Sequence, residues 1–262
     1  MHSKGLLGAA IFLVAAIACG AHVVHGHAQE ARFLRSFADS IPADPELSQY
    51  GRSRGAAAFQ ANCAACHGEK MQGDRHRGIP NLIDENWLYG TGRVSEIERV
   101  VLYGIRSGNS KGWDLASMPA FANPLPYKRY KIATLLPREI DDVTAYIMAF
   151  QHQATDAAAV ARGAQLFAGS ERGVCWDCHG EDARGDTAIG APDLTDNRWI
   201  VGDGTQQSIH DAIAFGMNGS CPAWIAKLPP ATIRSLAVYV ASFTPQPAAA
   251  SDSQSAQRST SK

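Results

Sequence analysis

The sequence has no excess of positive charge, no regular strand pattern and few cysteines, and each absence excludes a class of protein. Its 262 residues carry 24 Lys and Arg against 25 Asp and Glu, so a surface that binds nucleic acid is not expected. No stretch of any length alternates apolar with polar residues, which excludes a sheet-based domain. Four of the six cysteines lie in two short motifs. Cys19, in an apolar N-terminal stretch, and Cys221 are left over, so no pair remains for a structural disulfide.

The sequence also lacks an apolar run that is clearly long enough to cross a membrane. Lys4 precedes an apolar run over residues 5–20, which is long for the core of a signal peptide and short for a transmembrane helix. Small residues at Gly26 and Ala28 fit cleavage after Ala28, and residues 15–19 loosely resemble a lipoprotein box. Residues 1–28 are therefore predicted to be a cleaved signal peptide, an uncleaved anchor or a lipidated terminus, and all three export the rest of the chain.

Two cysteines that are three positions apart and followed directly by a histidine occur twice in the chain. This spacing is typical of covalent haem c attachment, because each thiol can add to one haem vinyl group and the histidine can bind the iron as proximal ligand. A zinc site would need paired clusters of four ligands, and a redox cysteine pair would need a βαβ pattern. The sequence thus predicts two haem c groups, held by Cys63, Cys66 and His67 and by Cys175, Cys178 and His179.

An internal repeat surrounds the two motifs and predicts the architecture. Corresponding residues lie 112 positions apart from the cysteines to Tyr103-Gly104 and Phe215-Gly216, and 103 positions apart at Met118 and Cys221. The first copy therefore carries nine extra residues between Gly104 and Met118. Each copy ends in a helical pattern that begins at a proline, Pro137 or Pro230, and proline suits the first helical turn.

We therefore predict an all-α fold of two tandem class I cytochrome c domains after an N-terminal apolar targeting or anchor segment. A covalently held haem would supply much of the apolar core of each small domain. The predicted divisions are 1–28 for the signal peptide or anchor, 29–49 for a linker or short arm on the first domain, 50–150 and 158–245 for the two domains, 151–157 for the linker between them, and 246–262 for a disordered tail.

Each proximal histidine leaves the opposite face of the iron open. A methionine in the first copy, Met118, stands before Pro119 on a loop 51 residues after His67, and thioether ligation there would raise the reduction potential. The corresponding residue of the second copy is Cys221. Cys221 could bind that iron as a thiolate and lower the potential of the second haem, Met217 could bind in its place, or the iron could remain five-coordinate.

Two prolines follow the haem motifs at equal distances, Pro80 in the first copy and Pro192 in the second. A backbone carbonyl at either position could accept the Nδ1–H of the proximal histidine, which fixes the ring and tunes its basicity. The alternative is an ordinary turn proline.

These motifs resemble a known family, the dihaem cytochrome c subunit (subunit III) of cbb-type cytochrome c oxidases. The similarity covers residues 50–245 and implies His67 with Met118, and His179, as axial ligands. The family has Met where Cys221 stands and Arg where Met217 stands. The resemblance rests on residues 62–68, 78–82, 87–90, 104–108 and 118–121 for the first domain, and on residues 162–167, 190–196 and 222–224 for the second.

The sequence thus predicts an electron-transfer protein that has no catalytic centre of its own. The resemblance implies single electrons taken from a donor cytochrome or a quinol-oxidising complex and passed to the catalytic subunits of a haem–copper oxidase. It also implies the periplasmic side of the bacterial inner membrane, or the periplasm itself if residues 1–28 are removed. The alternatives are the cytochrome subunit of a periplasmic dehydrogenase, or a thiosulfate-oxidising enzyme with a Cys-ligated haem.

Overall fold

The computed structural model describes residues 24–123, 133–154 and 156–244, and within them the protein is helical with no named strand. The predicted all-α fold is confirmed. The segment at 24–35 is a helix. The elements that follow are η1 (Ala38–Ala43), α2 (Pro45–Asn62), α3 (Ala64–His67), η2 (Arg75–Arg77), α4 (Val94–Tyr103), α5 (Pro137–Phe150), α6 (Ala157–Phe167), α7 (Trp176–His179), α8 (Gln206–Phe215) and α9 (Pro230–Ala241).

Local sequence explains where the long helices begin. The carboxylate of Asp44 accepts hydrogen bonds from the amides of the first turn of α2, and Asp156 does the same for α6. Such caps satisfy amides that have no partner within the helix. Pro137 and Pro230 occupy the first positions of α5 and α9, as the sequence predicted, because a first-turn residue needs no amide donor.

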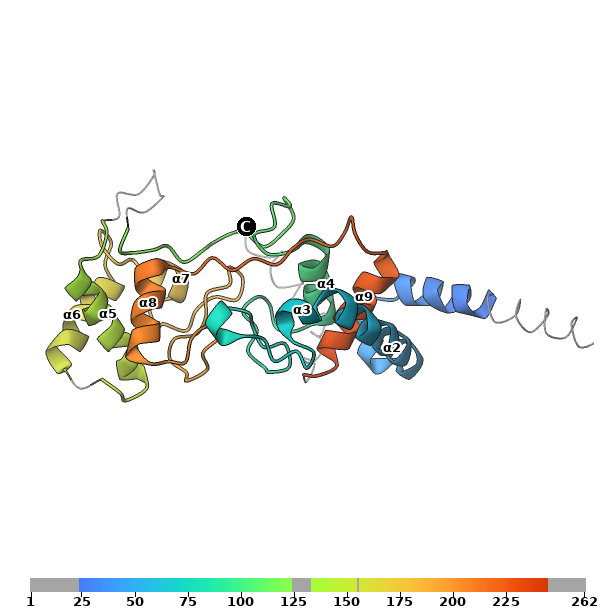
Figure 1. Ribbon diagram of the computed structural model, residues 1–262, viewed down its shortest axis with the longest axis horizontal. Helices are drawn as coiled ribbons and strands as arrows, with labels where there is room; N and C mark the ends of the chain where they lie inside the picture. Colours follow the sequence, from blue (N-terminus) through green and yellow to red (C-terminus); the bar gives the residue numbers. More distant parts are fainter. Residues whose placement is uncertain (1–23, 124–132, 155, 245–262) are drawn as a thin grey trace, which may run out of the picture.

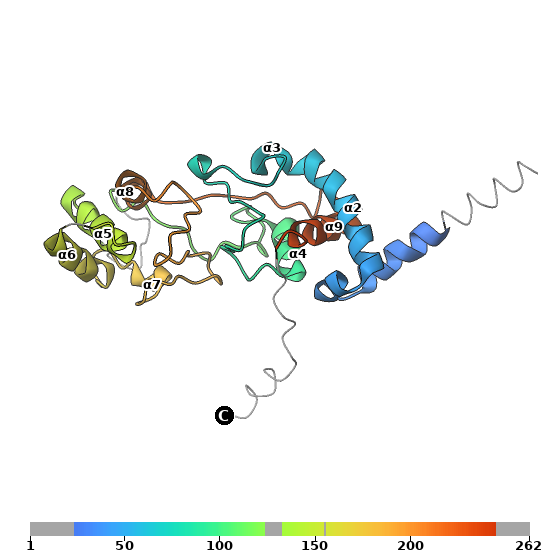
Figure 2. The same cartoon turned by 90° about the horizontal axis from the view of Figure 1, so that it is seen from below.

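The helices form two lobes, and each lobe combines elements from both copies of the repeat (Figures 1 and 2). Lobe 1 consists of α2, α3, α4 and α9, and lobe 2 of α5, α6, α7 and α8. Helix α9, at the end of the second copy, packs against α2 and α4 of the first copy, whereas α5, at the end of the first copy, packs against α6 and α8. The two terminal helices are thus exchanged between the copies.

The hydrophobic cores follow the exchanged division. The core of lobe 1 joins Phe59 of α2 and Val94 and Ile97 of α4 to Leu236 and Val240 of α9. The core of lobe 2 joins residues of α5 to residues of α6 and α8, namely Ile140, Val143, Ile147, Phe167, Ile209 and Ile213. The boundaries predicted from the repeat, 50–150 and 158–245, therefore differ from the boundaries of the packed units.

One glycine in each lobe allows the exchanged helix to approach closely. A Cβ added at Gly55 of α2 would lie 2.1 Å from the carbonyl oxygen of Ser235 in α9, and one added at Gly163 of α6 would lie 2.0 Å from that of Asp142 in α5. Gly55 and Gly163 correspond in the repeat. The same helix crossing therefore occurs in both lobes, and in each lobe it joins a helix of one copy to a helix of the other.

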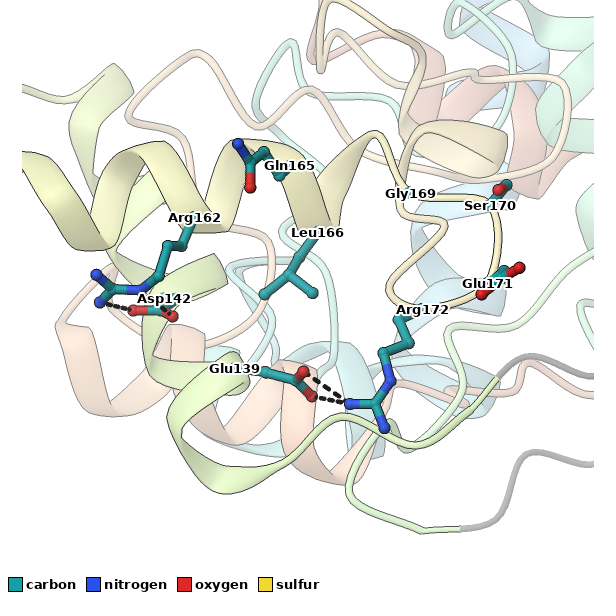
Figure 3. A pocket seen from close by; sticks show the side chains of 9 residues that line it. All are labelled: Glu139, Asp142, Arg162, Gln165, Leu166, Gly169, Ser170, Glu171 and Arg172. Atoms are coloured by element: carbon teal, nitrogen blue, oxygen red, sulfur yellow. Dashed lines mark hydrogen bonds and ion pairs between the residues drawn. The ribbon is translucent and has the colours of Figure 1, made fainter.

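Ion pairs join the exchanged helices to their lobes. In lobe 2, Arg162 of α6 forms a bidentate pair with Asp142 of α5, and Arg172 pairs with Glu139 of α5 at 2.5 Å (Figure 3). In lobe 1, Arg234 of α9 contacts Glu98 of α4 at 3.1 Å and also donates to backbone carbonyls at residues 33, 34 and 36. These charges favour the exchanged packing because they are paired within it.

Two residue pairs joined by backbone hydrogen bonds lie where the chain passes between the lobes. The backbones of Ile105 and Cys221 exchange two hydrogen bonds of 2.9 Å, and those of Met118 and Met217 exchange bonds of 3.2 and 3.0 Å. Only four positions separate Met217 from Cys221. In the first copy, the corresponding residues Ile105 and Met118 are thirteen positions apart, so the helix that follows is exchanged in both copies whatever the length of this segment.

The segment expected to be a linker or arm, residues 29–49, is helical and belongs to lobe 1. Its side chains Phe33, Ile41 and Leu47 are buried in the lobe 1 core, so the segment is an arm that completes this core. No helix within the described residues is long and apolar enough to cross a membrane. The apolar run over residues 5–20 and the predicted tail at 246–262 lie outside the described residues.

Candidate haem sites

The first haem motif forms a single helical turn, α3, directly after α2. Cys63 and Cys66 are free thiols, and Cys63 packs against the core of lobe 1. The Nδ1–H of His67 donates to the carbonyl oxygen of Pro80 at 3.4 Å. Burial lowers the pKa of His67, although the Pro80 carbonyl opposes this shift. A neutral ring with Nδ1 occupied leaves Nε2 free for a metal ion.

The second motif repeats this geometry in lobe 2. Helix α7 carries His179, which is buried, and its Nδ1–H donates to the carbonyl oxygen of Pro192 at 3.1 Å. Burial again lowers the pKa of the histidine against the opposing effect of the carbonyl. Both histidines are therefore held in the same orientation by the loop that follows them.

The loop after each motif explains why the sequence repeats there. The amide of Gly73 donates to the carbonyl of His67 at 2.9 Å, and Leu82 donates to Met71 at 2.9 Å. The corresponding bonds in lobe 2 run from Gly185 to His179 at 2.7 Å and from Leu194 to Ala183 at 2.8 Å. These bonds fold the loop back so that the proline carbonyl meets the histidine ring.

The surroundings of the motif thiols fit thioether formation better than a metal–thiolate cluster. Burial is the main cause that raises the pKa of Cys63 to about 11 and that of Cys175 to about 12. Within the described ranges, no three His, Cys, Asp or Glu side chains gather closely enough to hold a metal ion. A thiol that adds to a vinyl group needs no neighbouring charge, whereas a zinc cluster needs several thiolates or imidazoles together.

The structure places the candidate sixth ligands in the lobes opposite to those expected from the repeat. Met118 of the first copy packs against the lobe 2 core together with Cys175. Cys221 of the second copy lies close enough to Cys63 and Cys66 for electrostatic repulsion between thiolates to contribute to the raised pKa of Cys63 and of Cys221, after burial. Met217 points toward the loop after the first motif, with its Cε 3.9 Å from a Cβ built at Gly78.

A polar group missed by the sequence analysis lies beside lobe 1. The indole Nε1 of Trp113 is buried and has no hydrogen-bond partner in the part of the chain that the structure describes. Trp113 is held by backbone bonds to Gly104 and Arg106. A buried donor without an acceptor is costly, and a haem propionate would satisfy it. The free thiols, the available histidine nitrogens and this donor together fit haem c.

Arg106 is a second residue that the sequence analysis did not single out. Its guanidinium donates to the hydroxyl of Tyr89 at 2.8 Å, to the carbonyl of Ala116 at 3.0 Å and to the carbonyl of Gly219 at 2.5 Å. Arg106 therefore ties together the two segments that cross between the lobes. Its positive φ of 46° is a feature that sequence alone does not reveal.

The surface pocket drawn in Figure 3 is separate from both haem motifs. It lies along α5, α6 and the loop before α7, and its arginines are already paired with Asp142 and Glu139. None of its lining residues belongs to a haem motif or is a candidate axial ligand. We therefore assign it to the packing of the exchanged helix α5.

Comparisons with known proteins agree with this geometry. The family model for cytochrome c matches residues 53–151, and the model for cytochrome c oxidase, cbb3-type, subunit III, matches residues 158–240. A cbb3-type cytochrome c oxidase subunit FixP from Bradyrhizobium sp. is 38% identical over 84% of this chain and 70% of its own length.

Two further relatives extend the agreement. FixP from Rhizobium meliloti is 31% identical over 92% of this chain and 77% of its own length, and subunit CcoP from Cereibacter sphaeroides is 38% identical over 77% and 64%. The resemblance and the two covalently bound haem c groups predicted from the sequence are confirmed. The chain belongs to the family of subunit III of cbb3-type cytochrome c oxidases, the dihaem cytochrome c subunit that transfers electrons.

Proposed function

We propose that this chain receives single electrons from a donor cytochrome or a quinol-oxidising complex and passes them to the catalytic subunits of a haem–copper oxidase, on the periplasmic side of the bacterial inner membrane. The observation that carries the proposal is the pair of equivalent motifs, each with an oriented histidine, in a chain whose relatives are oxidase subunits. When bound, haem c supplies a one-electron iron couple.

The motif residues have distinct roles in this proposal. Cys63, Cys66, Cys175 and Cys178 would hold the two haems through thioether bonds, each made by adding a thiol S–H across one vinyl group with nothing released. His67 and His179 would offer Nε2 to the iron, and the carbonyls of Pro80 and Pro192 orient their rings. A ligand whose second nitrogen is fixed in this way moves little when the charge of the metal changes.

The indole of Trp176 offers a contact surface for an electron-transfer partner. This side chain lies between the two cysteines of the second motif, is 36% exposed, and donates from Nε1 to the carbonyl of Gly169 at 3.0 Å. An aromatic ring fixed at the surface costs little conformational entropy when it binds a partner. Residues between motif cysteines border the haem edge, so docking there would shorten the path for an electron.

The first prediction concerns stoichiometry. Intact mass and haem-stained gels of protein from a host that attaches haem c should report two haem additions per chain. Changing Cys175 and Cys178 together to alanine should leave one, because both thioethers of one haem are lost. Cys221→Ser is the matched control and should leave two. Fewer than two haems in the unaltered protein would contradict the assignment of the motifs.

The second prediction tests the function. Membranes from a bacterium that relies on this oxidase should lose most oxygen uptake driven by the native donor when the Cys175 and Cys178 variant replaces the unaltered chain, although the oxidase still assembles. A small artificial reductant that reaches the catalytic subunits directly should restore the uptake, because only the supply of electrons is interrupted. Normal uptake with the native donor would refute electron transfer through this chain.

A further inference from the structure

We propose that residues 105–117, which hold the nine extra residues of the first copy, form a binding site for one propionate of the haem held by His67. The indole Nε1–H of Trp113 is the hydrogen-bond donor of this site. The nine residues have no counterpart in the second copy, so the site distinguishes one haem from the other. The inference rests on bound haem c and not on the oxidase partner.

The unpartnered indole of Trp113 is the first observation. Its Nε1 is buried, and no acceptor for its hydrogen lies among the residues that the structure describes. A buried donor without an acceptor destabilises a fold, so an acceptor from outside the polypeptide is expected. The propionates are the carboxylates that haem itself carries, and a carboxylate accepts strong hydrogen bonds.

Backbone bonds and ring packing hold the indole in place. The amide of Trp113 donates to the carbonyl of Gly104 at 3.0 Å, and the amide of Arg106 donates to the carbonyl of Trp113 at 2.9 Å. The ring of Tyr89 packs against the indole with 5.4 Å between the centroids, and Arg106 donates to the Tyr89 hydroxyl at 2.8 Å. The donor is therefore oriented before any ligand arrives, which lowers the entropic cost of binding.

The position of the loop assigns the site to the first-motif haem. The backbone of Ile105 pairs with Trp113 on one side and with Cys221 on the other. The thiol of Cys221 in turn lies close to those of Cys63 and Cys66. Haem carries its propionates on the edge opposite its vinyl groups, so they lie across the ring from the two motif cysteines. The loop that holds Trp113 lies in this neighbourhood.

The charges around the indole favour an anion. The guanidinium of Arg99 in α4 lies over the indole ring, 4.5 Å from its centroid, and has no carboxylate partner among the described residues. The Nζ of Lys111 lies 5.5 Å from the ring centroid of Tyr103. Asp114 is the one carboxylate in residues 105–117, and it is exposed. Cations beside a carboxylate favour its ionised form.

The second copy has none of these features at the corresponding positions. Val201 stands where the first copy has Tyr89, and Asp211 stands where it has Arg99. Residues 217–220, which lead to Cys221, contain no tryptophan and no cation. The second-motif haem therefore serves as an internal control for any change made at Trp113.

The experiment uses full-length chains that carry one haem each. One chain keeps only the first-motif haem (Cys175 and Cys178 to alanine), and the other keeps only the second-motif haem (Cys63 and Cys66 to alanine). Trp113→Phe retains an aromatic ring against Tyr89 and removes the donor. It should lower the frequency of the propionate bending band in the resonance Raman spectrum of the first chain and leave the band of the second chain unchanged.

The reduction potential gives a second readout of Trp113→Phe. A carboxylate that loses its donor keeps more negative charge near the iron, and this charge stabilises the oxidised state. At low ionic strength, where screening is weakest, the one-electron equilibrium of the first-motif haem should move toward the oxidised state by about two- to tenfold. A purely structural role of Trp113 would lower the melting temperature or the haem content without these changes.

Two further variants complete the test. Arg99→Gln removes the cation over the indole and should move the potential of the first-motif haem in the same direction. Trp224→Phe is the matched control, because Phe121 stands at the corresponding position of the first copy, and it should change neither the band nor the potential.

Two results would overturn the proposal. The first is an unchanged propionate band of the first-motif haem in a fully loaded Trp113→Phe chain, or a shift of the second-motif band in its place. If Trp113→Phe prevents haem attachment, Arg99→Gln decides, because Arg99 is exposed and its removal disturbs no core. An unchanged potential of the first-motif haem in that variant is the second contradicting result.

Discussion

Replacing Gly55 with valine is expected to detach α9 from lobe 1. The Cβ would lie 2.1 Å from the Ser235 carbonyl oxygen and 2.5 Å from the Tyr239 Cβ. Backbone atoms cannot move away from the new side chain as the end of a flexible side chain could, so the two helices would have to separate. Overpacking of this kind costs about 3 kcal/mol, which corresponds to roughly 6–12 °C in melting temperature for a protein of this size.

The matched control for Gly55→Val is Ala57→Val, because Ala57 is exposed on the same helix. Both variants place a valine in α2. Valine is a better helix former than glycine and a poorer one than alanine, so helix propensity alone would favour Gly55→Val, and a larger loss of stability at Gly55 must come from the helix crossing. Thermal unfolding followed by circular dichroism gives the comparison. Equal melting temperatures would mean that α9 does not pack on α2 at Gly55.

Replacing Cys221 with methionine is expected to raise the reduction potential of the haem held by His67. A thioether stabilises the reduced iron relative to a thiolate or an open site. Because axial ligands set haem potentials over about 0.8 V, we expect an increase on the order of 0.1–0.2 V. Each 59 mV changes a one-electron equilibrium tenfold, so the electron distribution between the two haems should change by more than tenfold.

A spectroscopic redox titration of the dihaem protein gives the measurement, and the single-haem variants assign each potential. In the unaltered protein, the iron ligated by Met118 should be reduced first. Because Met118 packs against the lobe 2 core together with Cys175, we expect this iron to be the one at the second motif, which reverses the order of potentials expected from the repeat. The matched control is Met217→Leu, which should shift neither potential by a comparable amount. If Cys221→Met raises the potential of the second haem alone, Cys221 does not lie at the iron held by His67.

Much of the local structure could be predicted from the sequence because it depends on neighbouring residues. The spacing of Cys63, Cys66 and His67 determines the turn that presents a haem motif, whatever lies across from it. Pro137 and Pro230 begin α5 and α9 as predicted, because the first turn of a helix requires no distant partner. The offset of the repeat likewise identified Met118 and Cys221 as corresponding positions.

The sequence alone could not decide which copy each terminal helix completes. Both copies carry a helix with the same apolar face and a glycine, Gly55 or Gly163, that admits it, so either pairing satisfies the local pattern. Only the tertiary structure decides between them, through contacts between residues far apart in the chain, such as Arg234 with Glu98. These distant contacts favour the exchanged pairing. The loops that carry Met118 and Cys221 lie in the same lobe as the helix that follows each of them.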